Sequence, residues 1–413
     1  MVTVASLFNQ LLQHFPRTEF GALVRKHNAE RGAKGFTCWT QFVAMLFCQL
    51  AHSDSLREIC NGLSCSLGKL VHLGITRSPK KSTLSYANEK RPAALFEDLF
   101  WTALNRFRNT QMLGARQHRF RFKNKLLSLD STTISLCLSL FPWAAFKTIK
   151  GGIKTHVLLD HDDYLPQYVL ITNAKKPDVH VAHLLALTPG SVVVMDMGYI
   201  DYQLYAKWTK AGIFFVTRLR EDLNWKLDES KPVPSNRNIL EDQIIRFDSR
   251  WGRRDCGNLK FRRIVVRIDD EEPLVLLTNH LQFGATTIAD IYKDRWQIEV
   301  FFKALKQNLK IKSFVGTSPN AIYIQIWTAL IAMLLLKWLH YLSKAKWSLS
   351  NLAAMLRLNL FTYRDLRAWL DAPFSTPTSH PVSRSVALRV RIILDSTASE
   401  TADLILKMHN SQL

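Results

Sequence analysis

Three observations in the sequence predict an α/β protein with a mixed sheet at its centre and helical regions at both ends. The apolar residues recur with a helical period up to about residue 118, and with the period of strands from about residue 119. A helical period returns near residue 286. With 413 residues, of which 47% are hydrophobic, the chain can bury a substantial core, and its length suggests two to four domains.

Residues 1–118 are predicted to form a helical DNA-binding domain. Its most patterned part predicts a helix over 55–63, a short helix over 68–73, and a further helix that opens at Ser82 or Thr83. Four basic residues surround this last helix: Lys80, Lys81, Lys90 and Arg91. Three short helices with such charges are compatible with a helix-turn-helix-like unit whose final helix enters a DNA groove. A plain helical bundle with basic edges is the alternative.

Strands and helices alternate between residues 119 and 220. Apolar runs predict strands in KNKLLSLDSTTISL, KTHVLLD, LPQYVLITNA, SVVVMD and IFFVTRLR, and helices in VHVAHLLALT and YIDYQLYAKWTKAG. The order β-β-β-α-β-α-β is that of a ribonuclease-H-like catalytic core, which we expect to continue over residues 286–345. Residues 221–285 break this rhythm and predict a β-rich insertion with strands in FRRIVVRI and EPLVLLTN. Residues 346–413 are predicted to form a helical, basic C-terminal region.

The charge of the chain points to a polyanionic partner. There are 55 Lys and Arg residues against 34 Asp and Glu residues, which gives a net charge of +21. A field of this sign attracts nucleic acid, the first candidate partner, and an anionic membrane surface, the second. The segment 321–339 is apolar for about sixteen residues before Lys337, whereas a spanning helix needs about twenty. We therefore expect a buried core helix there and no membrane.

The cysteines and the N-terminus indicate a cytoplasmic protein. The six cysteines form no C-x2-C pair and no metal-ligand spacing, so we expect reduced, buried thiols. The first twenty residues lack the charged and apolar regions of a signal peptide.

One predicted helix carries four polar residues with the spacing Y-x2-R-x3-E-x6-K: Tyr292, Arg295, Glu299 and Lys306. At about 100° per residue these positions share one narrow stripe. An opposite apolar stripe is expected to pack on the sheet, and consists of Ile288, Ile291, Ile298, Phe302, Leu305 and Leu309. The polar stripe suits phosphate and metal binding, and a solvated helix face with i,i+4 charge pairs is the alternative.

Three carboxylates are candidates for a catalytic metal site. Asp130 lies in an apolar strand, where an unpaired charge is costly to bury, and Asp196 ends the strand SVVVM. These strands are neighbours in a ribonuclease-H-like sheet, and Glu299 would approach from the helix beside them. Three carboxylates so placed suit two Mg²⁺ ions in phosphoryl transfer. The alternatives are a strand-end turn for Asp130 and a helix cap for Asp196.

The cluster Asp160–Asp163 could also suggest a metal site, but it falls at a predicted hairpin, where Asp is common in turns. His156 and His180 are expected to be structural or solvent-facing rather than metal ligands.

The ordered motifs resemble the bacterial insertion-sequence transposases of the DDE class, in the IS-four family. The resemblance rests on the Y-x2-R-x3-E-x6-K spacing, LDSTT at 129–133, MDMGY at 195–199 and, in the leader domain, NEKR at 88–91. It implies that Asp130, Asp196 and Glu299 bind two Mg²⁺ ions, for which Mn²⁺ can substitute, and that Tyr292, Arg295 and Lys306 hold phosphates near the cleaved end.

The resemblance also implies an activity. The enzyme would cut an insertion sequence at its terminal inverted repeats, form hairpin ends, and join the 3′ ends to target DNA as a synaptic homodimer in the bacterial cytoplasm, associated with the nucleoid. A base flipped near the hairpin would stack on an aromatic side chain of the insertion, for which Trp251 and Trp225 are candidates. Two alternatives stay open: a nuclease or resolvase without strand transfer, and a catalytically silent DNA-binding regulator derived from a transposase.

Overall fold

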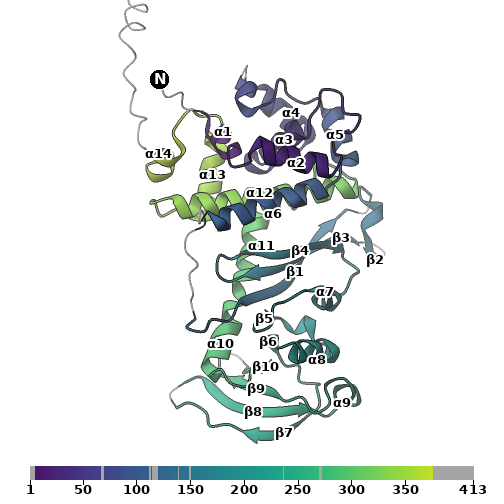
Figure 1. Cartoon of the computed structure of the whole chain (residues 1–413), viewed down its shortest axis with the longest axis vertical. Coiled ribbons are helices and arrows are strands. Elements are labelled where there is room, and N and C mark those ends of the chain that lie inside the picture. The colour runs from purple at the N-terminus through teal and green to yellow at the C-terminus, as the bar shows by residue number, and fades with distance from the viewer. Residues whose placement is uncertain are drawn as a thin grey trace, which may run out of the picture.

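The computed structural model describes residues 5–374 except 67–68, 111–112, 114–119, 138, 148–149, 236 and 269–271. The N-terminal part is helical, as predicted (Figure 1). Its elements are α1 (Leu7–Leu12), α2 (Arg17–Lys26), α3 (Cys38–Ala51), α4 (Leu56–Ser64), the 3-10 helix η1 (Lys69–Leu73), α5 (Lys81–Lys90) and α6 (Ala94–Asn109). Local sequence fixes several of these boundaries. At α4, for example, Ser55 accepts from the Glu58 N–H and Glu58 accepts from the Asp54 N–H, which is a capping box.

A single mixed sheet of ten strands forms the lower part of the molecule in Figure 1. Its strands are β1 (Leu126–Leu136), β2 (Ala145–Lys147), β3 (Lys150–Asp160), β4 (Leu165–Asn173), β5 (Val192–Met195), β6 (Phe214–Arg218), β7 (Trp225–Ser230), β8 (Ile239–Phe247), β9 (Phe261–Val266) and β10 (Leu274–Thr278). The order is β2-β3-β1-β5-β6-β10-β9-β8-β7, and β4 also pairs with β3. Strand β1 runs parallel to β5, and β5 runs parallel to β6, whereas β3 is antiparallel to β1.

Helices cover both faces of this sheet. The remaining helical elements are η2 (Pro142–Ala144), α7 (Asp178–Leu184), η3 (Met197–Tyr199), α8 (Tyr202–Lys210), α9 (Arg250–Cys256), α10 (Ala285–Asp294), α11 (Trp296–Asn308), α12 (Pro319–Leu342), α13 (Leu349–Asn359) and α14 (Leu366–Asp371). One apolar cluster joins Leu127 and Leu129 of β1 to Tyr205 and Trp208 of α8. A second cluster, on the other face, joins Leu126 of β1 to α10.

The predicted single helix of the polar stripe is two helices, α10 and α11, that meet at Arg295. Arg295 keeps helical dihedral angles (φ −51°, ψ −31°), so the direction of the stripe is largely preserved. The apolar stripe is buried as predicted, but it divides between two cores. Ile288 and Ile291 pack with the sheet, whereas the residues from Ile298 onward pack with the helices of the N-terminal region. The interruption lies where the helix passes from one core to the other.

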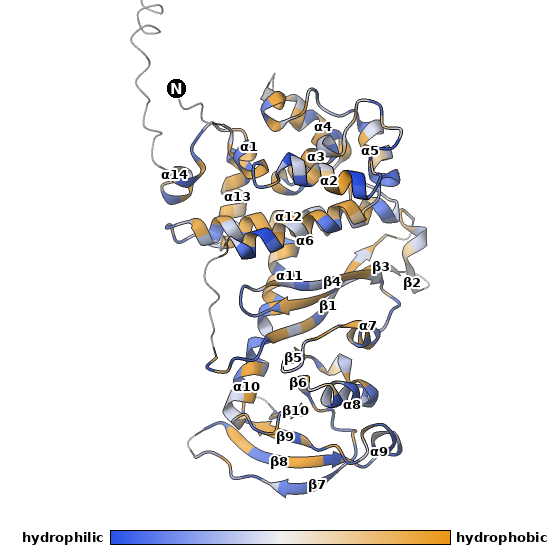
Figure 2. Cartoon of the chain, viewed as in Figure 1, coloured by the Kyte–Doolittle hydropathy of each residue, from blue (hydrophilic) through white to orange (hydrophobic). Residues whose placement is uncertain are grey.

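Helix α12 lies in the core, as predicted. It is long and apolar enough to cross a membrane by length and composition, but 89% of its most apolar window is buried inside the protein. Figure 2 shows it as a mostly hydrophobic rod between the upper helices and the sheet. The C-terminal helices α13 and α14 share this core with the N-terminal region, and the Leu7 N–H donates to the Thr362 carbonyl. The described chain ends at residue 374, so most of the predicted C-terminal region lies outside it.

Three sequence expectations need correction. The predicted insertion contains β7, β8 and α9 in addition to the two expected strands, and it is not a separate sheet, because β10 pairs directly with β6. Helix α7 ends at Leu184, four residues earlier than predicted. All six cysteines are free thiols, but Cys65 and Cys137 are exposed rather than buried.

Candidate active site

The two candidate aspartates lie at the same edge of the sheet. Leu129 of β1 pairs with Met195 of β5 in parallel register, and each candidate is the next residue along its strand. Asp130 accepts from the Ser131 N–H, and Asp196 caps η3 by accepting from the Gly198 N–H at 2.8 Å. Asp196 therefore serves as a cap, which was the structural alternative, while also standing beside Asp130.

Glu299 approaches this edge from the first turn of α11. Arg295 connects it to the sheet, because its Nη1 atom lies 3.4 Å from Glu299 Oε1 and 4.0 Å from Asp130 Oδ2. The Arg295 guanidinium also lies 5.7 Å from the centre of the Tyr292 ring. The structure thus gathers Asp130, Asp196, Glu299, Arg295 and Tyr292 into one site, although they come from three distant parts of the sequence.

The site is electrostatically strained towards binding a cation. Burial raises the pKa of Asp130 to about 7, and the charges of Glu299 and Asp196 add to this effect, while the Ser131 N–H and Arg295 oppose it. Burial alone would lower the pKa of Arg295, but Tyr292, Asp130 and Glu299 outweigh it and the pKa is raised. A desolvated carboxylate beside two others gains most from a nearby positive charge.

The donor atoms of the three carboxylates fit a hard cation such as Mg²⁺, which prefers oxygen ligands. Among the described residues, no group of three or more His, Cys, Asp or Glu side chains is close enough together to hold an ion as placed. Instead, the Arg295 guanidinium contacts two of the carboxylates. Metal binding at these residues would therefore require Arg295 to move aside or to shift its contacts towards DNA.

The remaining residue of the stripe lies further along α11. Lys306 Nζ donates to the Thr133 carbonyl of β1 at 3.4 Å, which places it on the same side of the strand edge. Burial and the neighbouring Lys312 lower the pKa of Lys306, and Glu299 opposes this shift.

A cavity of about 600 Å³ adjoins the stripe. Tyr292, Arg295 and Trp296 line one side of it, and Arg237 and Arg267 from the insertion line the other. Trp296 is 63% exposed although it is one of the largest apolar side chains. The sequence prediction omitted Trp296, Arg237 and Arg267. An aromatic residue directly after the motif arginine was the available signal for Trp296.

The predicted stacking residues lie elsewhere. Trp251 is exposed on α9, stacked under the Arg254 guanidinium at 4.3 Å, and α9 packs beside α8 (Figure 1). Trp225 of β7 packs against the same apolar cluster as α8. Since α10 covers the opposite face, the structure does not bring either tryptophan beside Tyr292.

The predicted DNA-binding residues around α5 differ in their surroundings. Lys80 and Lys81 are exposed at the start of the helix, and Lys90 is exposed but pairs with Glu89 at 2.7 Å. The Arg91 guanidinium instead donates to the Phe36 carbonyl and, at 3.2 Å, to Gln41 Oε1. Arg91 therefore has partners inside the protein, which favours a structural role for it.

The other polar candidates behave as expected. His156 is fully buried and bonds to Thr172 Oγ1 at 2.8 Å, and His180 is exposed. Residues 160–163 form the turn between β3 and β4, as predicted.

Comparison with known proteins agrees with this site. A family described as "Transposase DDE domain" matches residues 121–335, and a family described as a domain of unknown function, DUF4372, matches residues 3–76. The sheet edge with its acidic residues lies inside the first match. An acidic site on a mixed sheet defines the broad class, and the match covers more than half of the chain. The chain belongs to the transposases with a DDE domain, which are enzymes that cleave and transfer DNA strands.

Individual relatives are transposases of bacterial insertion sequences. The chain is 30% identical to transposase y4zB of Sinorhizobium fredii over 73% of its own length and 83% of that protein. It is 30% identical to the transposase for insertion sequence element IS5377 of Geobacillus stearothermophilus, over 56% of its own length and 60% of that protein. A solved piggyBac transposase synaptic complex with hairpin DNA matches at 12% identity and a TM-score of 0.42, over 92% of this chain and 84% of that one, and supports no argument here.

Proposed function

We propose that the chain cuts an insertion sequence out at its terminal inverted repeats, through hairpin ends, and joins the 3′ ends to target DNA as a member of the IS-four family. The proposal is supported by the full Y-x2-R-x3-E-x6-K spacing and by the contacts among Tyr292, Arg295 and Glu299. The strand order β4-β3-β1-β5-β6, with β3 antiparallel to β1, also supports a ribonuclease-H-like core.

Asp130, Asp196 and Glu299 would hold two Mg²⁺ ions, or Mn²⁺ in their place. When bound, the ions would activate the attacking oxygen and stabilise the leaving oxygen of the phosphodiester. The protein itself contributes the raised pKa of Asp130, which makes proton release part of metal binding.

The cations of the stripe would position the DNA end. Arg295 is a bidentate phosphate donor by chemistry, and a phosphate near Glu299 would compete for the guanidinium that now contacts the carboxylates. Lys306 supplies a point charge further along α11, and Tyr292 supplies a hydroxyl or a ring face. The adjoining cavity, lined by Trp296, Arg237 and Arg267, has the charge and aromatic surface that an unstacked base and its phosphates need.

We also propose that the partners are the inverted repeats and target DNA, and that the protein acts as a homodimer in the cytoplasm near the nucleoid. The net charge of +21 supports the DNA partners. The burial of α12 supports the assignment of that helix to the core rather than to a membrane.

The position of Glu299 beside Asp130, bridged by Arg295, is the observation that carries the proposal. The test is Glu299→Gln, with Glu221→Gln at an exposed position as the control. The substrate is linear DNA that carries both ends of the element, incubated with full-length protein and Mg²⁺ or Mn²⁺. We expect Glu299→Gln to bind the ends and not to cleave them, and Glu221→Gln to behave as wild type.

The products decide between the alternatives. Hairpin ends and joined molecules support cut-and-paste transposition, whereas cleavage without either indicates a nuclease or resolvase activity. End binding by the wild type with no cleavage in either metal indicates a silent DNA-binding copy. Normal cleavage by Glu299→Gln would falsify the assignment of the site.

A further inference from the structure

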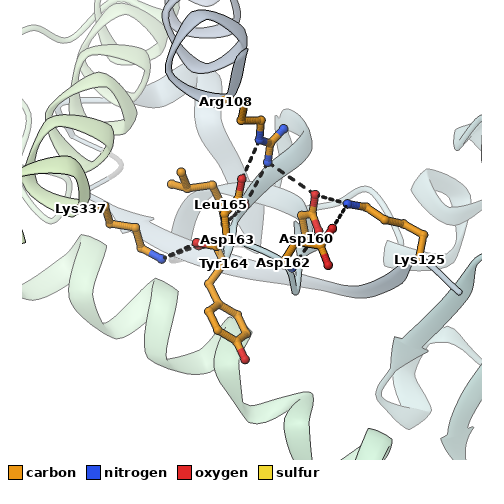
Figure 3. A network of polar contacts seen from close by, with 8 residues as sticks. All are labelled: Arg108, Lys125, Asp160, Asp162, Asp163, Tyr164, Leu165 and Lys337. Carbon is orange, nitrogen blue, oxygen red and sulfur yellow. Dashed lines mark hydrogen bonds and ion pairs between the residues drawn. The ribbon is translucent and has the colours of Figure 1, made fainter. Parts of the chain in front are cut away.

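The turn between β3 and β4 connects several distant parts of the chain. Arg108 of α6 makes two hydrogen bonds to the Asp163 carboxylate, at 2.7 and 3.0 Å. Lys125, just before β1, contacts Asp160 and Asp162, and Lys337 of α12 donates to the Tyr164 carbonyl at 2.6 Å (Figure 3). Tyr164 has a positive φ of 52°, which is uncommon for a bulky residue and shows that the turn is held firmly.

A fifth residue of this turn, His161, reaches the junction of α10 and α11. His161 Nδ1 lies 2.7 Å from Asp294 Oδ2, and His161 Nε2 lies 2.6 Å from Ser128 Oγ. A carboxylate can only accept, so Nδ1 carries a hydrogen and donates it to Asp294. The side chains of His161 and Asp294 are only 5% and 1% exposed, so water cannot substitute for these bonds easily.

The bridge ends at two positions that adjoin the site. Ser128 and Asp130 lie two residues apart in β1, and therefore project from the same face of the sheet. Leu127 and Leu129 point to the other face, towards α8. At the far end of the bridge, Asp294 directly precedes Arg295. The bridge Ser128–His161–Asp294 thus runs beside the contact between Asp130 and Arg295, and it is shorter and more buried.

We propose that His161 and Asp294 are positioning residues for DNA cleavage, which hold the α10–α11 junction against β1 and so set Arg295 and Glu299 against Asp130. The single residue between the two helices makes such a support necessary, because Arg295 belongs to neither helix and α10 and α11 pack in different cores. Since the turn also binds Arg108 and Lys337, the same support ties the junction to α6 and α12. The inference rests on the proposed active site.

The test compares full-length wild type with His161→Ala, His161→Gln and His27→Ala in single-turnover cleavage of DNA that carries both ends of the element. His27 is a matched control, because its Nε2 atom makes a 2.7 Å bond to Asp98 in the helical region, remote from the junction. We expect His161→Ala to lower the cleavage rate about 10- to 100-fold, the effect of misplacing reacting groups by about 1 Å. Binding of the ends should change by less than about twofold, since the bridge touches no predicted phosphate ligand directly.

Two readouts separate positioning from general destabilisation. A glutamine amide can donate to Asp294 and accept from Ser128, so His161→Gln should recover about tenfold of the lost rate. The Mg²⁺ concentration for half-maximal cleavage should rise in His161→Ala and not in His27→Ala. If His161→Ala does not fold, Ser128→Ala removes one bond of the bridge and should slow cleavage about fivefold.

The outcomes also separate this inference from the proposed site. Wild-type cleavage by His161→Ala, or an equal loss of rate in His27→Ala, overturns the positioning role while leaving a dead Glu299→Gln in place. Active Glu299→Gln together with slow His161→Ala means that the site itself was misassigned, so the positioning role towards Glu299 is overturned as well.

Discussion

Replacement of Asp130 by asparagine should stabilise the metal-free protein at neutral and higher pH. The Asp130 side chain is 15% exposed, and burial together with Glu299 and Asp196 raises its pKa from 3.8 to about 7. Asparagine has nearly the same shape and can still accept from the Ser131 N–H, but it carries no charge. The substitution therefore removes the cost of ionising this group in the folded state.

The sign and size of the effect follow from linkage between proton binding and folding. The folded state holds this proton more tightly than the unfolded state, so the stability of the wild type falls as the pH rises from about 4 to about 7. A shift of about three pKa units corresponds to at most about 4 kcal/mol. About 3 kcal/mol of this lies between pH 5 and pH 7, and relaxation of the site reduces it, so we expect a pH-dependent difference of about 1–2 kcal/mol.

The assay is urea unfolding in EDTA at pH 5 and pH 8. The free energy of unfolding of Asp130→Asn minus that of wild type should be larger at pH 8. Asp222→Asn is the control, because Asp222 is exposed and bonded to Arg220, which lowers its pKa, and should show no such gain. Millimolar Mg²⁺ should stabilise the wild type at pH 8 more than Asp130→Asn. A difference that does not change with pH, or that is smaller at pH 8, refutes the electrostatic account.

Two further predictions concern DNA binding. Trp296→Ala should change the free energy of unfolding by less than about 0.5 kcal/mol, because the side chain is exposed, and should weaken binding of a transposon end by about 1–3 kcal/mol in a filter or anisotropy assay. A larger binding loss for Trp251→Ala would return the stacking role to the insertion. Arg91→Ala should cost about 1–3 kcal/mol in unfolding because it leaves the buried acceptors at Phe36 and Gln41 unpaired. Lys80→Ala and Lys81→Ala should leave stability unchanged and each lower the salt slope of DNA binding by about 1, and an equal loss of stability in all three variants contradicts this division.

The parts of the fold that were predictable are those whose pattern is local. Alternating apolar residues identified β1, β3, β4, β5 and β6, because each strand packs at least one face in a core. The stripe on α10 and α11 was predictable for the same reason, since helical spacing alone places its polar residues together.

The insertion strands were missed because their pattern is not one of apolar alternation. Strand β7 lies at the sheet edge and is largely exposed, so it has no buried face to mark it. Strand β8 contains Asp242, which is buried because it pairs with Arg262 of β9 at 2.6 Å. A buried ion pair between two strands is invisible in either strand alone, since each charge taken singly predicts an exposed position.

The same reasoning explains why the site was only half predictable. The sequence supplies the candidates for the site, because residue type and spacing set what chemistry a motif can perform. Their positions relative to each other depend on contacts such as His161 with Asp294, which join residues 133 positions apart. The turn Asp160–Tyr164 illustrates this limit. Its composition predicted a turn and nothing more, yet its side chains contact α6, α12 and the α10–α11 junction. An acidic turn that meets basic side chains from three directions is better suited to fixing the geometry of a neighbouring metal site than to binding a metal itself, because its carboxylates are already neutralised.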